Sequence, residues 1–517
     1  MFGKKNRKPT DKGISGSNTG DEKTNTLKKE LIDNINLFRS IFSQDDTLVI
    51  RSFQNKYLNE AKCCVIYFDG MVNKETLNED VILPVLGNNL SEKISKHNLL
   101  EELQNKVITS NKVNLETDLS VIIEEVICGN TVFLLDGFDS ALIICNKGWH
   151  SRTIEEPHAE TVVRGPREGF TEALTTNIPL IRRRIKSPKF KIKYLHVGVR
   201  THTKIGICYI DDIVSKDILR EVEKRLREID IDGILDSGYI QELIRDAPYS
   251  PFETVGYTER PDVVASKVLE GRVAIIVDGS PFVLTVPFVI GENTQSCEDY
   301  YNNYIFSTIN RLIRTTSSIT SMSIPAIYLA VVTYHQEMVP TRLLLSLSAA
   351  RQGVAIPTSL SLFLMLLLFD VLKEAGTRMP QAIGQAVNIV GALVLGEAAV
   401  EAKLVSAPVV IITALSGILT LLNIKLIGAV IVFRYIFLLL ASVIGIYGYI
   451  IGFMFLLLHL MSIRSFGVPY LLNVTSVKDQ AGNDMWIRAP WWDMTLRPKI
   501  IAARNLVRQT TNKRRKR

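Results

Sequence analysis

The feature that most constrains this chain is a long stretch near its C-terminal end that is almost free of charge. Between Val354 and Ile463 the acidic and basic residues are only Asp370, Lys373, Glu374, Arg378, Glu397, Glu401, Lys403, Lys425 and Arg434. Charged residues make up about 25% of an ordinary soluble chain, and the part before this stretch is charged in that ordinary way. The sequence therefore predicts soluble domains followed by an α-helical polytopic membrane domain, and it excludes a purely soluble enzyme.

Several segments are long enough to cross a bilayer, which takes about 20 largely apolar residues. They are Val354–Leu372, Ala382–Val400, Leu404–Leu422 and Leu426–Ile463. The last would be roughly 57 Å long as one helix, so we expect it to kink or split near Gly445–Gly452. Pro325–Val339 is shorter and carries His335 and Glu337, so it is either a re-entrant or interfacial segment, which we prefer, or a short span. The membrane domain is assigned to residues 321–463, with four to six helical segments.

Both ends of the chain are expected on the cytoplasmic side. Residues 1–26 are basic and rich in Gly and Ser, and they lack the apolar core of a signal peptide, so they predict a disordered arm. Residues 464–517 form a tail with nine basic residues and no acid after Met494, a pattern typical of a cytoplasmic segment. Residues 27–150 and 151–320 are then two cytoplasmic domains, and the number of crossings is even.

The soluble domains are predicted to be α/β or α+β. Thr131–Ile144 and Arg272–Val286 each contain two apolar runs around Asp-Gly, the strongest short signal for a β-hairpin. Val214–Ile229 has the apolar spacing of an amphipathic helix. The hairpins are similar in sequence, FLLDG then ALII and IIVDG then FVLT. Either duplication of one unit or convergence on a favoured turn explains this likeness.

The sequence offers no catalytic set and no cofactor or metal motif. It lacks GxSxG, HExxH and glycine-rich nucleotide-binding strings, and its six cysteines form no CxxC pair. The basic run Arg182–Lys193 has only Phe190 and Tyr194 as aromatic neighbours. A nucleic-acid groove would interleave more aromatics with the charges. We therefore expect a face toward anionic membrane lipid and no nucleic-acid partner.

Polar groups inside the predicted spans are candidates for function, because placing them in lipid is costly. One helical stripe consists of Gln381, Gln385 and Asn388. These amides either hydrogen-bond between helices or line a water-filled pore. Leu362 and Leu366 are candidates for a hydrophobic gate. Arg434 is expected to reach the interface or to pair with Glu397.

Several short motifs follow one another between Arg164 and Tyr470. They are RGPREGF at 164–170, IRRRI at 181–185 after Asn177, TERPD at 258–262, EGR at 270–272 before DGSPF at 278–282, EDYY at 298–301, EAGTRMP at 374–380 and SFGVPY at 465–470. In this order they resemble the A subunit of the GerA family of spore germinant receptors. The chain departs from the family pattern with PFET at 251–254, serines after Ile356-Pro357, LKEA at 372–375 and Glu397 in place of a frequent Gln.

The resemblance implies a subunit of a nutrient germinant receptor in the spore inner membrane. Its expected partners are a transporter-like B subunit, a lipoprotein C subunit and further copies of itself in a pentameric ring. Such a ring would be a ligand-gated cation channel that triggers germination. The alternatives are a non-conducting scaffold that couples the sensor to release, and an accessory sporulation homologue of the same family.

The charged residues of two of these motifs are expected at contacts between domains or between subunits. They are Arg164, Arg167, Glu168, Glu259, Arg260 and Asp262. Each group surrounds a proline turn that fixes the direction of its charges. Local salt bridges within one domain are the alternative.

Overall fold

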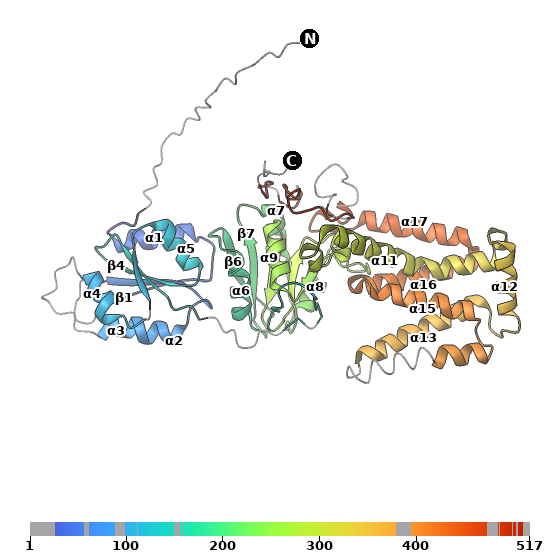
Figure 1. Ribbon diagram of the computed structural model, residues 1–517. Helices are drawn as coiled ribbons and strands as arrows, with labels where there is room; N and C mark the ends of the chain where they lie inside the picture. Colours follow the sequence, from blue (N-terminus) through green and yellow to red (C-terminus); the bar gives the residue numbers. More distant parts are fainter. Residues whose placement is uncertain are drawn as a thin grey trace, which may run out of the picture. The chain divides into compact units, whose positions relative to one another are not determined.

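A computed structural model describes most of the chain (Figure 1). The described residues are 26–55, 62–87, 99–110, 112–148, 156–157, 159–378, 394–472, 484, 486–498, 500–502 and 505–509. The chain divides into two units, one of residues 1–41 and 49–148 and the other of residues 42–48 and 149–517. All but the last residue of the predicted basic arm lies outside the described residues.

The first unit contains a five-stranded sheet in the order β1-β2-β4-β5-β3. Its strands are β1 Leu48–Gln54, β2 Lys62–Phe68, β3 Val113–Glu116, β4 Thr131–Leu135 and β5 Ala141–Ile144. Its α-helices are α1 Leu31–Ile41, α2 Lys74–Leu77, α3 Leu83–Gly87, α4 Leu99–Glu102 and α5 Leu119–Ile127. The β4–β5 pair is antiparallel, which confirms the predicted hairpin around the first Asp-Gly turn.

The second unit begins with another five-stranded sheet, in the order β6-β7-β9-β10-β8. Its strands are β6 Phe190–Val197, β7 Thr203–Ile210, β8 Gly256–Thr258, β9 Val273–Val277 and β10 Val283–Val286. The helices of this part are α6 Leu174–Arg182, α7 Lys216–Arg227, α8 Ser237–Ile244 and α9 Pro261–Leu269. All four strand pairings are antiparallel, so the soluble part is α+β.

Helices cover both faces of this second sheet. Along β9, Ile275 packs with α7 and α8, whereas its neighbour Ile276 packs with α6 and α9. This alternation follows from the two-residue period of a strand. Because both faces are buried, β9 has no polar residue from Val273 to Val277. The hydrophobic run therefore reflects a three-layer core.

The two sheets have the same topology. In each, the strands taken in chain order are arranged first, second, fourth, fifth and third. In each, the aspartate of the Asp-Gly turn accepts a hydrogen bond from the first residue of the preceding long helix: Asp136 from the Leu31 N–H and Asp278 from the Leu174 N–H, both at 2.9 Å. Shared order and shared long-range contacts favour duplication of one unit over convergence on a turn.

A second repeated contact lies at the start of the same two helices. Asn34 in α1 bonds the backbone N–H and carbonyl of Lys28, and Asn177 in α6 bonds those of Thr171. Both asparagines are buried. Their amides satisfy backbone groups that would otherwise lack partners where the chain enters the helix.

Replacing Asn177 by alanine is expected to lower the free energy of unfolding of the second sheet by about 2 kcal/mol, because buried backbone groups of Thr171 lose their partner. Hydrogen exchange of α6 in the full-length protein measures this. The matched control is Asn114→Ala on an exposed position of β3, for which we expect no change. Equal exchange of α6 in both variants would contradict the role assigned to Asn177.

The helices that follow pack against one another as a bundle (Figure 1). They are α11 Tyr304–Thr333, α12 Thr341–Arg351, α13 Thr358–Arg378, α15 Ala407–Leu421, α16 Ile427–Ile444 and α17 Ile446–Ser462. Among the described residues, α11 and the helix from Ile424 to Ile444 are long and apolar enough to cross a membrane, while α15 and α17 are apolar but shorter. Most of the predicted span Ala382–Val400 lies outside the described residues.

The first bundle helix differs from the sequence prediction. Pro325 does not open a short separate segment but lies inside α11, which begins before the predicted domain boundary at 321. A proline there leaves the Ser321 carbonyl without its helical donor. The Ser416 hydroxyl of α15 donates to that carbonyl at 2.7 Å, and Ser321 donates to the Ser416 carbonyl at 2.8 Å. This reciprocal serine pair lets the helix continue through the proline.

The long apolar segment from Leu426 splits as predicted, at Gly445. This residue has φ 66° and ψ −138°, a conformation that favours glycine, and it separates α16 from α17. A side chain at Gly448 would meet the Leu440 carbonyl. The two glycines therefore allow a tight turn followed by close helix packing.

Candidate functional site

A cavity of about 410 Å³ lies between the second sheet and the bundle. Its walls come from residues 159–162, α9, the loop before α11, the loop between α15 and α16, and the C-terminal tail. Charged side chains of both signs line it, and most of them form ion pairs with one another. We refer to this cavity and its ion pairs as the junction.

Arg260 is the central side chain of the junction. It is fully buried and donates to the Pro166 carbonyl at 2.7 Å, the Glu160 carbonyl at 3.2 Å and Asp262 Oδ2 at 3.1 Å. The same Asp262 oxygen accepts a hydrogen bond from the Tyr301 hydroxyl at 2.5 Å. Arg260 therefore fixes the segment before α6 and, through Asp262, the segment that leads into α11.

An ion pair connects the bundle directly to the soluble part. Lys425, in the turn between α15 and α16, lies 3.1 Å from Glu160. The other carboxylate oxygen of Glu160 accepts a hydrogen bond from Thr258 at the end of β8. Glu160 thus joins a turn of the bundle to the edge strand of the second sheet.

A buried cluster of charged side chains lines one part of the junction. Glu292 pairs with both Lys267 of α9 and Arg272 beside β9. Arg272 also donates to the Pro287 carbonyl at 2.5 Å. Burial lowers the pKa of the Lys267 ammonium well below its ordinary value, and the nearby positive charge of Arg272 lowers it further.

A further cluster fixes the first turns of α11. Arg311 is fully buried, and its guanidinium lies 3.2 Å from Asp299 and 3.1 Å from Asp484 of the C-terminal tail. Arg314 pairs with the same Asp299 at 2.5 Å. Burial raises the pKa of the Asp484 carboxyl, while Arg311 and the Tyr300 hydroxyl stabilise its charged form. The tail is therefore held to the base of the helix.

The last bundle helix returns to the soluble part. After α17, β11 Arg464–Ser465 and β12 Val468–Pro469 form a short hairpin. The Ser465 hydroxyl donates to the Thr254 carbonyl at 2.7 Å, and Phe466 and Val468 join the core of the second sheet. The first and last helices of the bundle are thus both fixed to one soluble domain.

One ion pair lies inside the bundle itself. Arg434 of α16 is 1% exposed and lies 2.5 Å from Asp370 of α13, and the Tyr435 hydroxyl donates to the same carboxylate at 2.8 Å. The predicted pairing of Arg434 with Glu397 is therefore wrong, because Arg434 pairs with Asp370. Asp370 can reach Arg434 because α13 lies beside α16. The spacing of residues in the sequence does not reveal that these two helices are neighbours.

The structure separates the predicted contact residues into two groups. Arg260 and Asp262 belong to the junction, and Glu259 accepts from the Ala159 N–H at 3.1 Å nearby. Arg164 and Arg167 are exposed, and Arg167 lies 3.7 Å from Glu156.

The arginines of the basic run beside the second sheet are paired with acids. Glu168 pairs with Arg183 at 3.1 Å and with Arg184 at 2.6 Å. Arg182 is fully buried and lies 2.7 Å from Asp45. Acids of the same unit therefore neutralise these three arginines, and the contact of the run with lipid stays a prediction for its lysines. The sequence did not reveal these pairs, because Asp45 and Glu168 both lie outside the basic run.

The pore candidates are only partly described. Gln381, Gln385 and Asn388 lie outside the described residues. Leu362 and Leu366 are fully buried and pack against α11 and α16 of the same chain, for example against Leu329 and Leu438. This placement disfavours the gate prediction for the two leucines, because a gate residue must face the pore.

Most charges of the junction are already paired, and these pairs connect the soluble domain of the second sheet to the helices. In the part of the chain that the structure describes, no group of three or more His, Cys, Asp or Glu side chains is placed to hold a metal ion. The fold and the junction define a membrane protein in which the soluble domain of the second sheet is fixed to the first and last helices of the bundle.

The chain belongs to the GerA family of spore germination proteins, as its motifs predicted. The family model described as Bacillus/Clostridium GerA spore germination protein matches residues 36–500. This confirms the family resemblance and identifies the chain as an A-type subunit of a germinant receptor.

Curated relatives match over nearly their full length. The uncharacterized membrane protein YfkQ of Bacillus subtilis (strain 168) is 41% identical over 479 residues, which cover 92% of this chain and 92% of that protein. Spore germination protein KA of the same organism is 39% identical over 490 residues, 94% of this chain and 90% of that protein. Spore germination protein A1 of Bacillus subtilis (strain 168) is 34% identical over 449 residues, which cover 86% of this chain and 90% of that protein.

A solved structure was also found. It is the crystal structure of the N-terminal domain of the A subunit of the Bacillus megaterium spore germinant receptor GerK3. The sequence identity is 30% and the TM-score is 0.41, and the match covers 51% of this chain and 96% of that chain.

Proposed function

We propose that this A-type subunit forms a ring, a pentamer, in the spore inner membrane and that the ring is a cation channel opened by a germinant. The observation that carries the proposal is the junction: the soluble domain is fixed to α11, to α17 and, through Lys425 and Glu160, to the turn before α16. A movement of that domain would displace several helices together, which a gated path requires.

The proposed orientation places the soluble domains and both termini in the cytoplasm. Trp491 donates to the Tyr300 carbonyl at 3.2 Å, and the Trp492 ring lies 5.8 Å from the Tyr304 ring at the start of α11. Aromatic rings of this kind gather at membrane interfaces. Together with the basic tail, they support a cytoplasmic interface at this end of the bundle. A transporter-like B subunit would sense the germinant, and a lipoprotein C subunit would complete the receptor.

Within this proposal, the amide stripe of Gln381, Gln385 and Asn388 lines the conducting path. Amides replace part of the hydration shell of an ion without trapping it. A ring would repeat the stripe around one axis, which a single copy cannot do.

The complete purified receptor, transferred from liposomes into a planar bilayer, is expected to conduct potassium when it binds its germinant. The double substitution Gln385→Leu with Asn388→Leu is expected to abolish this current, which bilayer recording measures. The control is Thr316→Leu on the exposed face of α11, which removes a polar group outside the stripe. If the wild-type receptor binds germinant but never conducts, the subunit is a non-conducting scaffold. If the stripe variant conducts normally, the three amides serve helix packing and do not line the path.

A further inference from the structure

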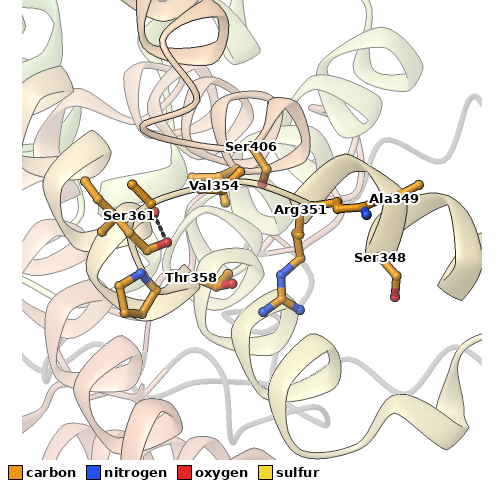
Figure 2. A pocket seen from close by; sticks show the side chains of 12 residues that line it. Ser348, Ala349, Arg351, Val354, Thr358, Ser361 and Ser406 are labelled. Carbon is orange, nitrogen blue, oxygen red and sulfur yellow. Dashed lines mark hydrogen bonds between the residues drawn. The ribbon is translucent and has the colours of Figure 1, made fainter.

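A second pocket lies at the end of the bundle that is remote from the junction (Figure 2). Its volume is about 760 Å³, and it is lined by the end of α12, residues 352–357, the start of α13 and the start of α15. The lining residues are Ser348, Ala349, Arg351, Gln352, Val354, Ala355, Ile356, Pro357, Thr358, Ser361, Ser406 and Val409. None of these residues is acidic, and one is a full cation.

Two helix N-termini open into this pocket. The 21-residue α13 begins at Thr358, and the 15-residue α15 begins directly after Ser406. The N-terminus of a helix carries about half a positive charge and free N–H groups. The C-terminal end of α12 places a partial negative charge nearby, but the full charge of Arg351 outweighs it.

The polar side chains in the pocket are available to a ligand. Among the described residues, the Arg351 guanidinium donates a long hydrogen bond to the Val332 carbonyl, at 3.4 Å, and forms no ion pair with a carboxylate. Thr358 is 8% exposed, and its hydroxyl has no hydrogen-bond partner among the described residues. Figure 2 shows this hydroxyl and the guanidinium pointing into the same space. Because Thr358 lines the pocket, its hydroxyl can donate a hydrogen bond to a ligand oxygen there.

The donors around the pocket favour a phosphate group as its ligand. Lys403 adds a second cation at the rim, since its ammonium lies close to Gly353. Cationic forks, hydroxyls and helix N-termini together are the donors that bind phosphate. We propose that this pocket binds a phosphate group, supplied either by a phospholipid headgroup or by free phosphate.

The first test uses the full-length protein, delipidated in detergent. Inorganic phosphate is expected to raise its thermal unfolding midpoint in a saturable way, relative to chloride at equal ionic strength. Arg351→Gln is expected to weaken the apparent affinity by about tenfold or more, because it removes a charge-assisted hydrogen bond. Thr358→Val keeps the shape of the side chain and should weaken it less. The matched control is Arg342→Gln, an exposed arginine of the same helix that does not line the pocket.

A second test separates the two sources. Nanodiscs of phosphatidylglycerol are compared with nanodiscs of a galactolipid, which has no phosphate. A headgroup site is stabilised in the first lipid without added phosphate, and native mass spectrometry retains a phospholipid on the wild type but not on Arg351→Gln. A free-phosphate site responds to added phosphate equally in both lipids. The proposal is overturned if Arg351→Gln and Thr358→Val both behave like Arg342→Gln in every arm, as they would if a carboxylate of a neighbouring copy filled the pocket.

Discussion

Full-length protein that carries Arg260→Ala is expected to be almost absent from the membrane fraction. The substitution leaves Asp262 and the carbonyls of Glu160 and Pro166 without their buried partner. Breaking a buried charge pair by removing one member costs about 3–5 kcal/mol, a large share of the roughly 5–15 kcal/mol that stabilises a folded domain. Immunoblots of membranes, together with thermal unfolding of any purified remainder, measure the effect.

The control for this prediction is Arg167→Ala in the neighbouring motif. Arg167 is 68% exposed and its ion pair with Glu156 is long, at 3.7 Å, so we expect a change within about 0.5 kcal/mol. Normal abundance of Arg260→Ala combined with a lost response to germinant would contradict the structural role and would make Arg260 part of the gate.

Asp370→Leu is expected to be the most damaging single substitution inside the bundle. It leaves the Arg434 guanidinium, which is 1% exposed, without its carboxylate partner. An unpaired charge in this setting costs about 3–5 kcal/mol. The expected results are a lower unfolding midpoint in detergent and loss of assembled receptor.

A double-mutant cycle tests whether the cost comes from the unpaired charge. Asp370→Leu with Arg434→Leu removes both charges, and replacing a buried pair by apolar residues is often neutral or stabilising. We therefore expect the double variant to recover much of the stability that each single variant loses. Glu397→Leu, which removes an exposed charge elsewhere in the bundle, serves as the charge-removing control. If the losses of the two single variants simply added in the double variant, the two side chains would not be coupled.

Local signals in the sequence predicted much of the soluble fold. The Asp-Gly turns located both hairpins, because they combine turn chemistry with apolar runs of strand length. Those signals did not reveal that Asp136 and Asp278 also accept a hydrogen bond from a distant helix start. Duplication became evident only when the order of all strands could be compared.

The limits of the α11 prediction have a different cause. Only Pro325–Val339 was singled out from this part of the sequence, whereas α11 spans Tyr304–Thr333 and includes Arg311, Arg314 and the serines and threonines after them. In the structure these hydroxyls bond backbone carbonyls of their own helix, as Thr315 does to Arg311 at 2.9 Å, and the arginines pair with Asp299. Polar residues whose groups are satisfied locally do not prevent a helix from entering an apolar environment.

The functional site was the least predictable part. Arg260 and Asp262 were selected because fixed charges flank a proline turn, but the sequence did not name the carbonyls and the tyrosine that they contact. Glu160 and Lys425 lie far apart in the sequence and carry no motif, so only the folded chain brings them together. The same holds for Asp370 and Arg434.

The hairpin after α17 has a consequence for biosynthesis. Phe466 and Val468 belong to the core of the second sheet, yet the ribosome makes them only after every helix of the bundle. At about 5–20 residues per second, the interval between Val277 and Val468 is roughly ten to forty seconds. During that time the nascent domain presents an unfilled hydrophobic site at the bilayer surface. Completion of the soluble domain therefore reports that the last helix has been inserted, so a chain with a misplaced helix is left with an unfinished core that proteases can recognise.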